Sequence, residues 1–300
     1  MEESNSYVEK FPQFVDAIKF QKEDLFWTHE EIKIEKDESD LKGDVMTEAQ
    51  RHALVFNQRL FTKYEDVIGN DYWIGVVHKR YKNSEVRRLA ICFADIENNT
   101  HFPFYRRVNE VIGTHNDEFY NAFETDPVLI ERVKFMSQLV GSKDTLASMG
   151  GFAFMEGAVL FTAFAMIKSF GVKGQTLMPN LIAGINMSIL DENFHMQSAC
   201  EIFKLQLELE GRSEEDLRKL KERIYRHAEN VVKHEDLIVD AMLAKGDIPF
   251  ASKVELKAFA RSRVNKVLVN LGFPELATFD ETGDTISEWF YKFMEAFTHN

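Results

Sequence analysis

The sequence contains few of the residues that interrupt regular secondary structure, with six prolines and fifteen glycines in 300 residues. Long stretches contain neither residue, which favours long helices over a turn-rich β architecture. Only two cysteines are present, Cys92 and Cys200, and both stand in apolar surroundings that are typical of core residues. We therefore predict an all-α protein without disulfides.

Positive charge is also scarce, because 36 lysines and arginines stand against 49 aspartates and glutamates, for a formal net charge of -13. This balance argues against binding to nucleic acid or to an anionic membrane, since both require a positive protein surface. The first six residues, MEESNS, have neither the basic region nor the apolar run of a signal peptide. We expect a cytoplasmic location.

An uninterrupted hydrophobic run is missing as well. The apolar stretch around residues 150–170 approaches the length of a membrane span, but Glu156 and Lys168 interrupt it. Its many small residues suit a helix that is buried in a protein core. We therefore predict a core helix there and no membrane span.

The hydrophobic fraction of 45% is sufficient for a substantial core. The sequence shows no internal repeat and no low-complexity linker, which indicates a single domain over residues 1–300. Residues 1–45 look irregular, with an extended patch at 31–35 and an acidic stretch at 36–44. We expect this segment to wrap around a core that is built downstream.

Capping patterns predict four long helices after this segment. Thr47 and Gln50 form a capping box, Asp144 can cap another helix, and Pro179 suits a first helical turn. The predicted helices cover residues 47–68, 84–112, 144–171 and 179–211, each ending at or before a glycine. Three further capping patterns lie at residues 213–216, 252–255 and 285–288, and residues 285–300 are predicted to form the last helix.

Two of the four helices carry a carboxylate and an imidazole about one turn apart. Glu97 and His101 lie on the second, and Glu192 and His195 lie on the fourth, so each pair can close on one metal ion. The third helix adds Glu156 in almost wholly apolar surroundings, where an ionised carboxylate needs a partner or a metal. The first helix offers two neighbouring acids near its end, Glu65 and Asp66.

Four carboxylates and two neutral imidazoles balance the charge of two divalent cations. One acid from each of two helices, with a Glu and His pair from each of the other two, is the arrangement of ferritin-like di-iron and di-manganese bundles. Oxygen and imidazole ligands without thiolate suit iron or manganese, and the sequence does not choose between them. We predict a ferritin-like helical bundle with additional helices around a four-helix dimetal core. The alternative is that the two pairs arise by chance on solvated faces.

The sequence resembles the small, radical-generating subunit of class I ribonucleotide reductase. The likeness covers roughly residues 20–290, and it rests on an ordered series of motifs rather than on any single one. These motifs are residues 26–31 (FWTHEE), 60–67 (LFTKYEDV), 82–87 (KNSEVR), 93–97 (FADIE), 156–161 (EGAVLF) and 191–195 (DENFH).

The resemblance implies a dinuclear centre that uses oxygen species to generate a radical or high-valent oxidant, which passes to a large catalytic subunit for deoxyribonucleotide synthesis. It implies a homodimer. It places Tyr105 at the family's radical tyrosine, and Trp27 and Asp191 on a relay toward the surface. The metal ligands that it implies are Asp66, Glu97, His101, Glu156, Glu192 and His195.

The sequence departs from the family pattern in two places. The family has Glu-x-x-His on the second helix, whereas one more residue separates Glu97 from His101; a bulge near Pro103 could absorb it, or the four-residue spacing itself could serve. Glu65 is a rival to Asp66 as a ligand. The family also has a flexible C-terminal tail with a tyrosine that is not found here, which suggests a shortened sequence.

Two other functions fit the same residues, namely a ferritin-like oxidase that acts on a small molecule and a metal storage protein. Trp27 with Asp191 argues against storage, because a storage site does not need a relay of electrons and protons to the surface.

His227, His234 and Glu235 have a spacing that resembles a metal-ligand set, but their charged surroundings favour a solvated helix face. Phenylalanines around the site could exclude water, although ordinary core packing is the simpler explanation. They are Phe102, Phe104, Phe152, Phe154, Phe161 and Phe194.

Overall fold

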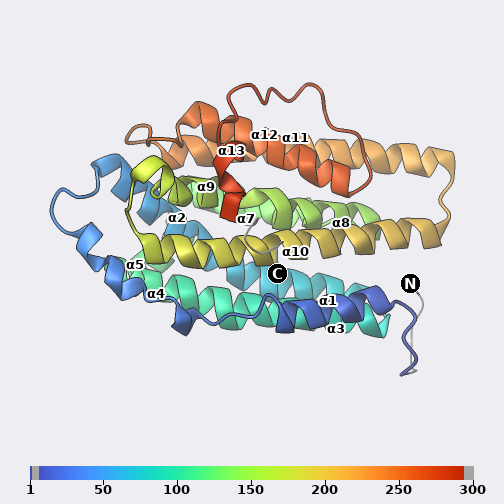
Figure 1. Ribbon diagram of the computed structural model, residues 1–300. Helices are drawn as coiled ribbons and strands as arrows, with labels where there is room; N and C mark the ends of the chain where they lie inside the picture. The colour runs from blue at the N-terminus through green and yellow to red at the C-terminus, as the bar shows by residue number, and fades with distance from the viewer. Residues whose placement is uncertain (2–6, 294–300) are drawn as a thin grey trace.

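The computed structural model describes residue 1 and residues 7–293, and it is built from helices. No β-strand occurs in this described part, where Ile248 and Ala251 form an isolated bridge. The prediction of an all-α fold is confirmed. The longest helices run side by side along one axis and form a bundle (Figure 1).

Most helices before residue 145 pack together, whereas the helix Pro127–Val140 also packs against two helices that follow it in the chain. The α-helices are α1 (Pro12–Glu23), α2 (Glu48–Asp66), α3 (Ser84–Ile96), α4 (Phe102–Ile112), α5 (Asp117–Tyr120), α6 (Ala122–Thr125) and α7 (Pro127–Val140). Two 3-10 segments, η1 (His29–Glu31) and η2 (Ile34–Leu41), precede α2. Two π-helical segments follow α2 and α3, namely η3 (Val67–His78) and η4 (Glu97–His101).

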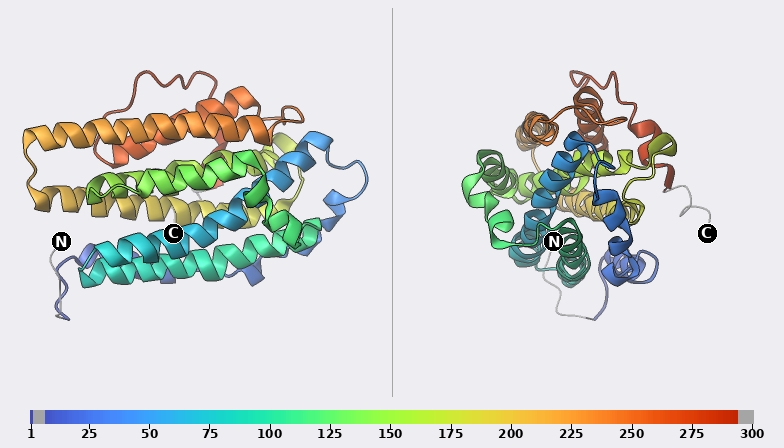
Figure 2. Two further views of the ribbon diagram at one scale, coloured as in Figure 1. Left: turned by 180° about the vertical axis from the view of Figure 1, so that it is seen from behind. Right: turned by 90° about the vertical axis from the view of Figure 1, so that its left-hand side faces the viewer.

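The remaining helices complete the bundle. They are α8 (Thr145–Phe154), the π-helical η5 (Met155–Val159), α9 (Phe161–Ser169), the 3-10 turn η6 (Val172–Gly174), α10 (Pro179–Glu210), α11 (Glu214–Met242), α12 (Lys253–Asn270) and α13 (Ser287–Phe290). Helix α10 contacts α8, η5 and α9, while α11 packs against α12 and α8. Figure 2 shows α10 from two further sides, enclosed by the other long helices.

The N-terminal segment is more regular than expected. Residues 12–23 form α1, which packs against α3 and α10, and 3-10 turns replace the extended patch expected at residues 31–35. Pro12 stands in the first turn of α1, where its missing N–H is not needed. Only Phe14 and Gln21 of this helix are buried, so its sequence carries no apolar stripe that would reveal it.

Most of the predicted helix boundaries agree with the structure. The side chains of Thr47, Asp144 and Ser252 cap α2, α8 and α12, and Gly113 and Gly211 end α4 and α10 in the left-handed conformation. Two predictions were wrong. The helix expected to end before Gly69 continues as η3, and Thr285 does not cap α13 because its hydroxyl donates to Glu255. Residues 294–300 of the predicted last helix lie outside the described residues.

The stretch Thr145–Ser169 is long and apolar enough to cross a membrane by length and composition alone. It comprises α8, η5 and α9, and the most apolar window within it is completely buried inside the protein. Its side chains belong to one hydrophobic cluster that α2, α10, α11 and α12 share. This stretch is therefore the central core segment, and it carries Glu156 into the middle of the bundle.

Candidate dinuclear metal centre

Six buried side chains from four separate segments converge inside the bundle. They fall into two overlapping groups, and within each group the ligand atoms all lie within 4.8 Å of one another. The first group is Glu65, Glu97, His101 and Glu192, and the second is Glu97, Glu156, Glu192 and His195. Because Glu97 and Glu192 belong to both groups, they lie between two neighbouring positions that could each hold an ion.

Most potential ligand atoms of this cluster have no protein partner in the described structure, although Nδ1 of His101 contacts Oε2 of Glu97 at 2.9 Å. Within the described part of the chain, both carboxylate oxygens of Glu65, Glu156 and Glu192 and both ring nitrogens of His195 have no hydrogen-bond partner. Nδ1 of His195 lies 2.8 Å from Oε1 of Glu97, but without the geometry of a hydrogen bond. Buried polar atoms are almost always paired, so this group of unpaired donors fits a pair of metal ions.

The electrostatics of the cluster lead to the same conclusion. Burial raises the pKa of Glu65, Glu156 and Glu192 well above the ordinary value for a carboxyl group, and the nearby charge of Glu97 raises each further. Burial would also raise the pKa of Glu97, but the adjacent imidazoles, first of all His101, hold it below the ordinary value. Two divalent cations would remove this repulsion. The charge and chemistry of the ligands therefore fit a dinuclear iron or manganese centre.

The structure places Glu65 in the cluster and leaves Asp66 outside it. The Glu65 side chain is fully buried, and its Oε2 lies 3.4 Å from Nδ1 of His101. The Asp66 side chain is 47% exposed and forms an ion pair with Lys63 at 3.1 Å. Successive helical residues point about 100° apart, so only one of the two neighbouring acids can face the bundle interior. The cluster therefore contains Glu65 and not Asp66, which the resemblance had implied as a ligand.

The additional residue between Glu97 and His101 is taken up by a π-helical turn. Residues 97–101 form η4, and Pro103 follows in the first turn of α4. The turn lies against η3 at Gly69, where an added Cβ would come within 2.3 Å of Nδ2 of Asn98. Glycine at position 69 therefore lets the two widened turns pack closely without displacing the Asn98 side chain. Single π-turns often occur at functional sites, and here the turn directs both Glu97 and His101 inward.

A chain of hydrogen bonds runs from the cluster toward the surface. Nε2 of His101 lies 2.9 Å from Oδ2 of Asp191, and the same oxygen accepts the indole N–H of Trp27 at 2.8 Å. All three side chains are buried, but Phe26, next to Trp27, is 62% exposed. Gln21 also donates to Asp191, at 2.7 Å, and sequence reasoning missed it because α1 was not predicted.

Tyr105 lies in the core beside the cluster, on the helix that follows His101. It is fully buried, and its hydroxyl donates to Oγ of Ser188 at 3.2 Å. Its ring stacks on Phe61, with the ring centroids 4.6 Å apart, and contacts Phe104 at 5.0 Å. Burial raises the pKa of Tyr105 well above its ordinary value, so the phenol keeps its proton in the resting protein.

Four of the six phenylalanines that could exclude water from the site are buried. Phe104, Phe152, Phe154 and Phe161 are buried, whereas Phe194 is partly exposed and Phe102 is 38% exposed. A phenylalanine that was not expected, Phe93, lies nearest His195, with ring centroids 4.2 Å apart. The Phe93 ring therefore covers one side of His195 with apolar surface.

On α11, His234 and Glu235 lie in the core rather than on a solvated helix face. Glu235 is fully buried and forms an ion pair with Arg132 at 2.5 Å, and His234 stacks on Phe135 with centroids 4.2 Å apart. The expectation of a solvated face was wrong for these two residues, because α7 and α9 cover this side of α11. Both cysteines are buried and unpaired, as predicted.

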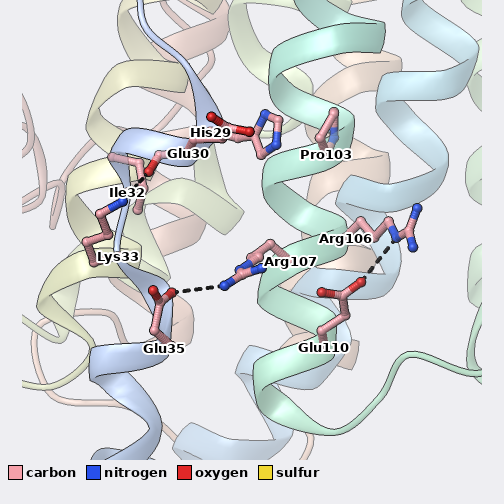
Figure 3. Close-up of a pocket in the computed structure, with 9 residues that line it drawn as sticks. All are labelled: His29, Glu30, Ile32, Lys33, Glu35, Pro103, Arg106, Arg107 and Glu110. Carbon is pink, nitrogen blue, oxygen red and sulfur yellow. Dashed lines mark hydrogen bonds and ion pairs between the residues drawn. The ribbon is translucent and has the colours of Figure 1, made fainter.

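A surface hollow of about 470 Å³ lies apart from the cluster, between the η1–η2 segment and α4 (Figure 3). Its charged side chains pair with one another, since Arg107 contacts Glu35 at 3.5 Å and Arg106 contacts Glu110 at 3.2 Å. It contains none of the proposed ligands. The hollow is therefore a polar feature of the surface, and the chemistry lies in the bundle interior.

Comparison with known proteins identifies the family of this chain. Residues 5–281 match the model of the family described as ribonucleotide reductase, small chain. The chain belongs to this family. The resemblance that the sequence motifs indicated is thereby confirmed.

Members of the ribonucleotide reductase small chain family from distant sources are similar to the chain. A protein described as a probable ribonucleoside-diphosphate reductase small subunit of Invertebrate iridescent virus 3 is 26% identical over 84% of this chain and 70% of its own length. The small chain of Nicotiana tabacum is also 26% identical, over 60% of this chain and 54% of its own length. The dimanganese(II)-NrdF structure of Streptococcus sanguinis covers 96% of this chain and 98% of its own, with a TM-score of 0.82 and 16% identity, and thus shares its fold.

Proposed function

We propose that this chain is the radical-generating small subunit of a class I ribonucleotide reductase, an oxidoreductase. We further propose that its metal ligands are Glu65, Glu97, His101, Glu156, Glu192 and His195. The observation that carries the proposal is the set of buried, unpaired carboxylate and imidazole donors inside a chain of this family. As ionised carboxylates, these groups are stabilised in an apolar core when cations bind them.

Each part of the site has a role in this function. When bound, the two ions would supply the redox chemistry that converts an oxygen species into a usable oxidising equivalent, which an organic side chain cannot do alone. Asp191 accepts the Nε2–H of His101, which fixes the tautomer that presents Nδ1 to the cluster. Trp27 is hydrogen-bonded to the same carboxylate, and its conjugated ring and indole N–H can carry an electron and a proton toward the surface. Tyr105 is the side chain that we propose stores the oxidising equivalent.

We also propose that the chain forms a homodimer in the cytoplasm and delivers its oxidising equivalent to a large catalytic subunit. Membership of a small chain family supports a large-subunit partner. A metal storage protein is not favoured, because the hydrogen-bonded path through Asp191 and Trp27 leads electrons and protons between the cluster and the surface, and storage does not need such a path.

The direct test activates the purified, metal-loaded chain with dioxygen or a reduced oxygen species, adds its cognate large subunit and a thiol reductant, and measures deoxynucleotide formation. Loading with Fe(II) and with Mn(II) in parallel, together with metal analysis of protein from its native host, identifies the ion. We expect turnover that requires both subunits and two ions per chain. A mixture that stays inert although both ions are bound and the subunits associate would refute the proposal.

A further inference from the structure

The π-helical segment η5 carries Glu156, and side chains from three other helices hold its backbone. Each donates to one of three alternating carbonyl groups in this segment. Tyr64 of α2 donates its hydroxyl to the carbonyl of Met155, Arg263 of α12 donates Nε to that of Gly157 at 2.9 Å, and Arg132 of α7 donates Nη2 to that of Val159 at 2.8 Å. A π-turn departs from the regular helical bonding pattern, and these donors stabilise its carbonyls from outside.

Arg263 is the most unusual of the three donors. Its side chain is 1% exposed, and among the described residues no carboxylate lies within ion-pair distance of its guanidinium. The guanidinium instead lies 3.6 Å from the centroid of the Phe161 ring and donates Nη1 to the hydroxyl of Tyr291 at 2.7 Å. A buried cation without an ion-pair partner is costly, which indicates that its position serves a purpose beyond packing.

Arg263 contacts the two residues that directly follow the proposed ligands Glu156 and Glu192 in the sequence. Its Nη2 donates to the carbonyl of Gly157, the residue after Glu156, at 2.5 Å. The same nitrogen donates to Oδ1 of Asn193, the residue after Glu192, at 3.0 Å. One planar group therefore sets the distance between η5 and α10 at the level of the cluster. The fixed fork of an arginine suits this role, because lysine presents only a point charge.

Gly157 makes this arrangement possible. A Cβ at this position would lie 2.5 Å from Cγ of Met196 and 2.5 Å from Cγ2 of Val267. The missing side chain lets α10 and α12 approach η5 closely, and Arg263 reaches the Gly157 carbonyl from α12. The sequence thus combines a glycine and a buried arginine at a single crossing of three helices.

We propose that Arg263 is a positioning residue for the metal ligands Glu156 and Glu192, and that Tyr64 and Arg132 fix the other two carbonyls of the same turn. The inference rests on the proposed function, because it assumes that these acids bind metal. Residues that orient metal ligands typically change metal affinity about 10–100-fold when they are removed. The ion held by Glu156 and His195 should be affected most, and the ion near Glu65 should be affected less.

The test measures Mn(II) binding to the metal-free full-length chain by calorimetry and by electron paramagnetic resonance of the bound ion. The variants are Arg263→Gln, which removes the charge and the fork, and Arg263→Lys, which keeps the charge alone. Arg261→Gln on the same helix is the matched control, because Arg261 pairs with Asp236 on α11 and does not contact η5. Phe14→Leu controls for a loss of core stability, because Phe14 is buried on α1, which packs against α3, and its ring contacts Phe11.

We expect two ions per chain in the wild type and in both controls. Arg263→Gln should bind the second ion about 10–100-fold more weakly and change its resonance spectrum, and Arg263→Lys should be intermediate. The inference is overturned if Arg263→Gln binds both ions like the wild type. It is also overturned if Phe14→Leu, at an equal loss of thermal stability, weakens the binding of the second ion as much. A wild type that binds no ion pair would instead overturn the proposed function and the inference together.

Discussion

Replacing Asp191 with asparagine separates the charge of this residue from its shape. The two carboxylate oxygens of Asp191 serve three neighbours, since Oδ1 accepts from Gln21 at 2.7 Å and Oδ2 contacts Trp27 at 2.8 Å and His101 at 2.9 Å. In Asp191→Asn the amide oxygen can keep the Trp27 and His101 contacts, so that the new NH₂ group faces Gln21. The Gln21 amide can then rotate, because its Oε1 has no hydrogen-bond partner within the described residues.

The variant should therefore fold, with a loss of about 1–3 kcal/mol in the free energy of unfolding, which is the size of one charge-assisted hydrogen bond. Its effect on function should be larger. The neutral amide keeps the contact with His101, but it no longer supplies the negative charge that stabilises a proton shared along the relay. Losses at such a position are typically about 10–100-fold in metal affinity or activity.

The assay measures metal content, thermal unfolding and nucleotide reduction on the same preparation. Gln21→Leu is the control, because it removes one hydrogen bond to Asp191 and leaves the charge and the other two contacts in place. We expect the control to reduce turnover much less than Asp191→Asn. If Asp191→Asn holds two ions and turns over like the wild type, the reasoning that Asp191 acts through its charge is refuted.

Three other predictions follow from the site. Tyr105→Phe should remove the tyrosyl signal from the electron paramagnetic resonance spectrum of activated protein while losing only about 1 kcal/mol of stability, and an unchanged signal would exclude Tyr105. Glu65→Gln should reduce the metal content, measured by elemental analysis, from two ions toward one, whereas Asp66→Asn should leave it unchanged; the opposite pattern would restore Asp66 as the ligand. Burial raises the pKa of Glu156 in the metal-free protein. The protonated Glu156 side chain therefore contributes fully to the free energy of unfolding below pH 4.5, the ordinary pKa of a glutamate. This contribution is lost as the pH rises through the pKa of Glu156 in the folded protein. The gain in melting temperature on adding Mn(II) should therefore be larger at about pH 8 than at about pH 6, and scanning fluorimetry that gives equal gains would contradict this.

Local signals in the sequence determined much of the fold. Thr47 and Ser252 sit at helix starts because their hydroxyls accept backbone amides, and Gly211 ends α10 because it adopts a positive φ. These interactions span three or four residues, so a single sequence reveals them. Helix α1 was missed because it has no apolar stripe, and the prediction for Thr285 failed because its hydroxyl reaches Glu255, 30 residues away in the sequence.

The candidate site was predictable where one helix carries both partners, as with Glu97 and His101. The choice between Glu65 and Asp66 was not, because it depends on how α2 is rotated within the bundle, and both acids have the same chemistry. The roles of Arg132 and Arg263 were also hidden. Each reaches a carbonyl more than 20 residues away in the sequence, and no local pattern marks a carbonyl that needs a donor.

The widened turn at residues 97–101 has a consequence for how the helix tolerates change in length. An extra residue in a regular α-helix rotates every later side chain by about 100°, which would turn Tyr105 and Phe104 away from the core. Because η4 accommodates five residues in about one turn, the rotation is absorbed before α4 begins. The ligand spacing can thus differ from the family pattern while the aromatic side chains beyond it keep their orientation.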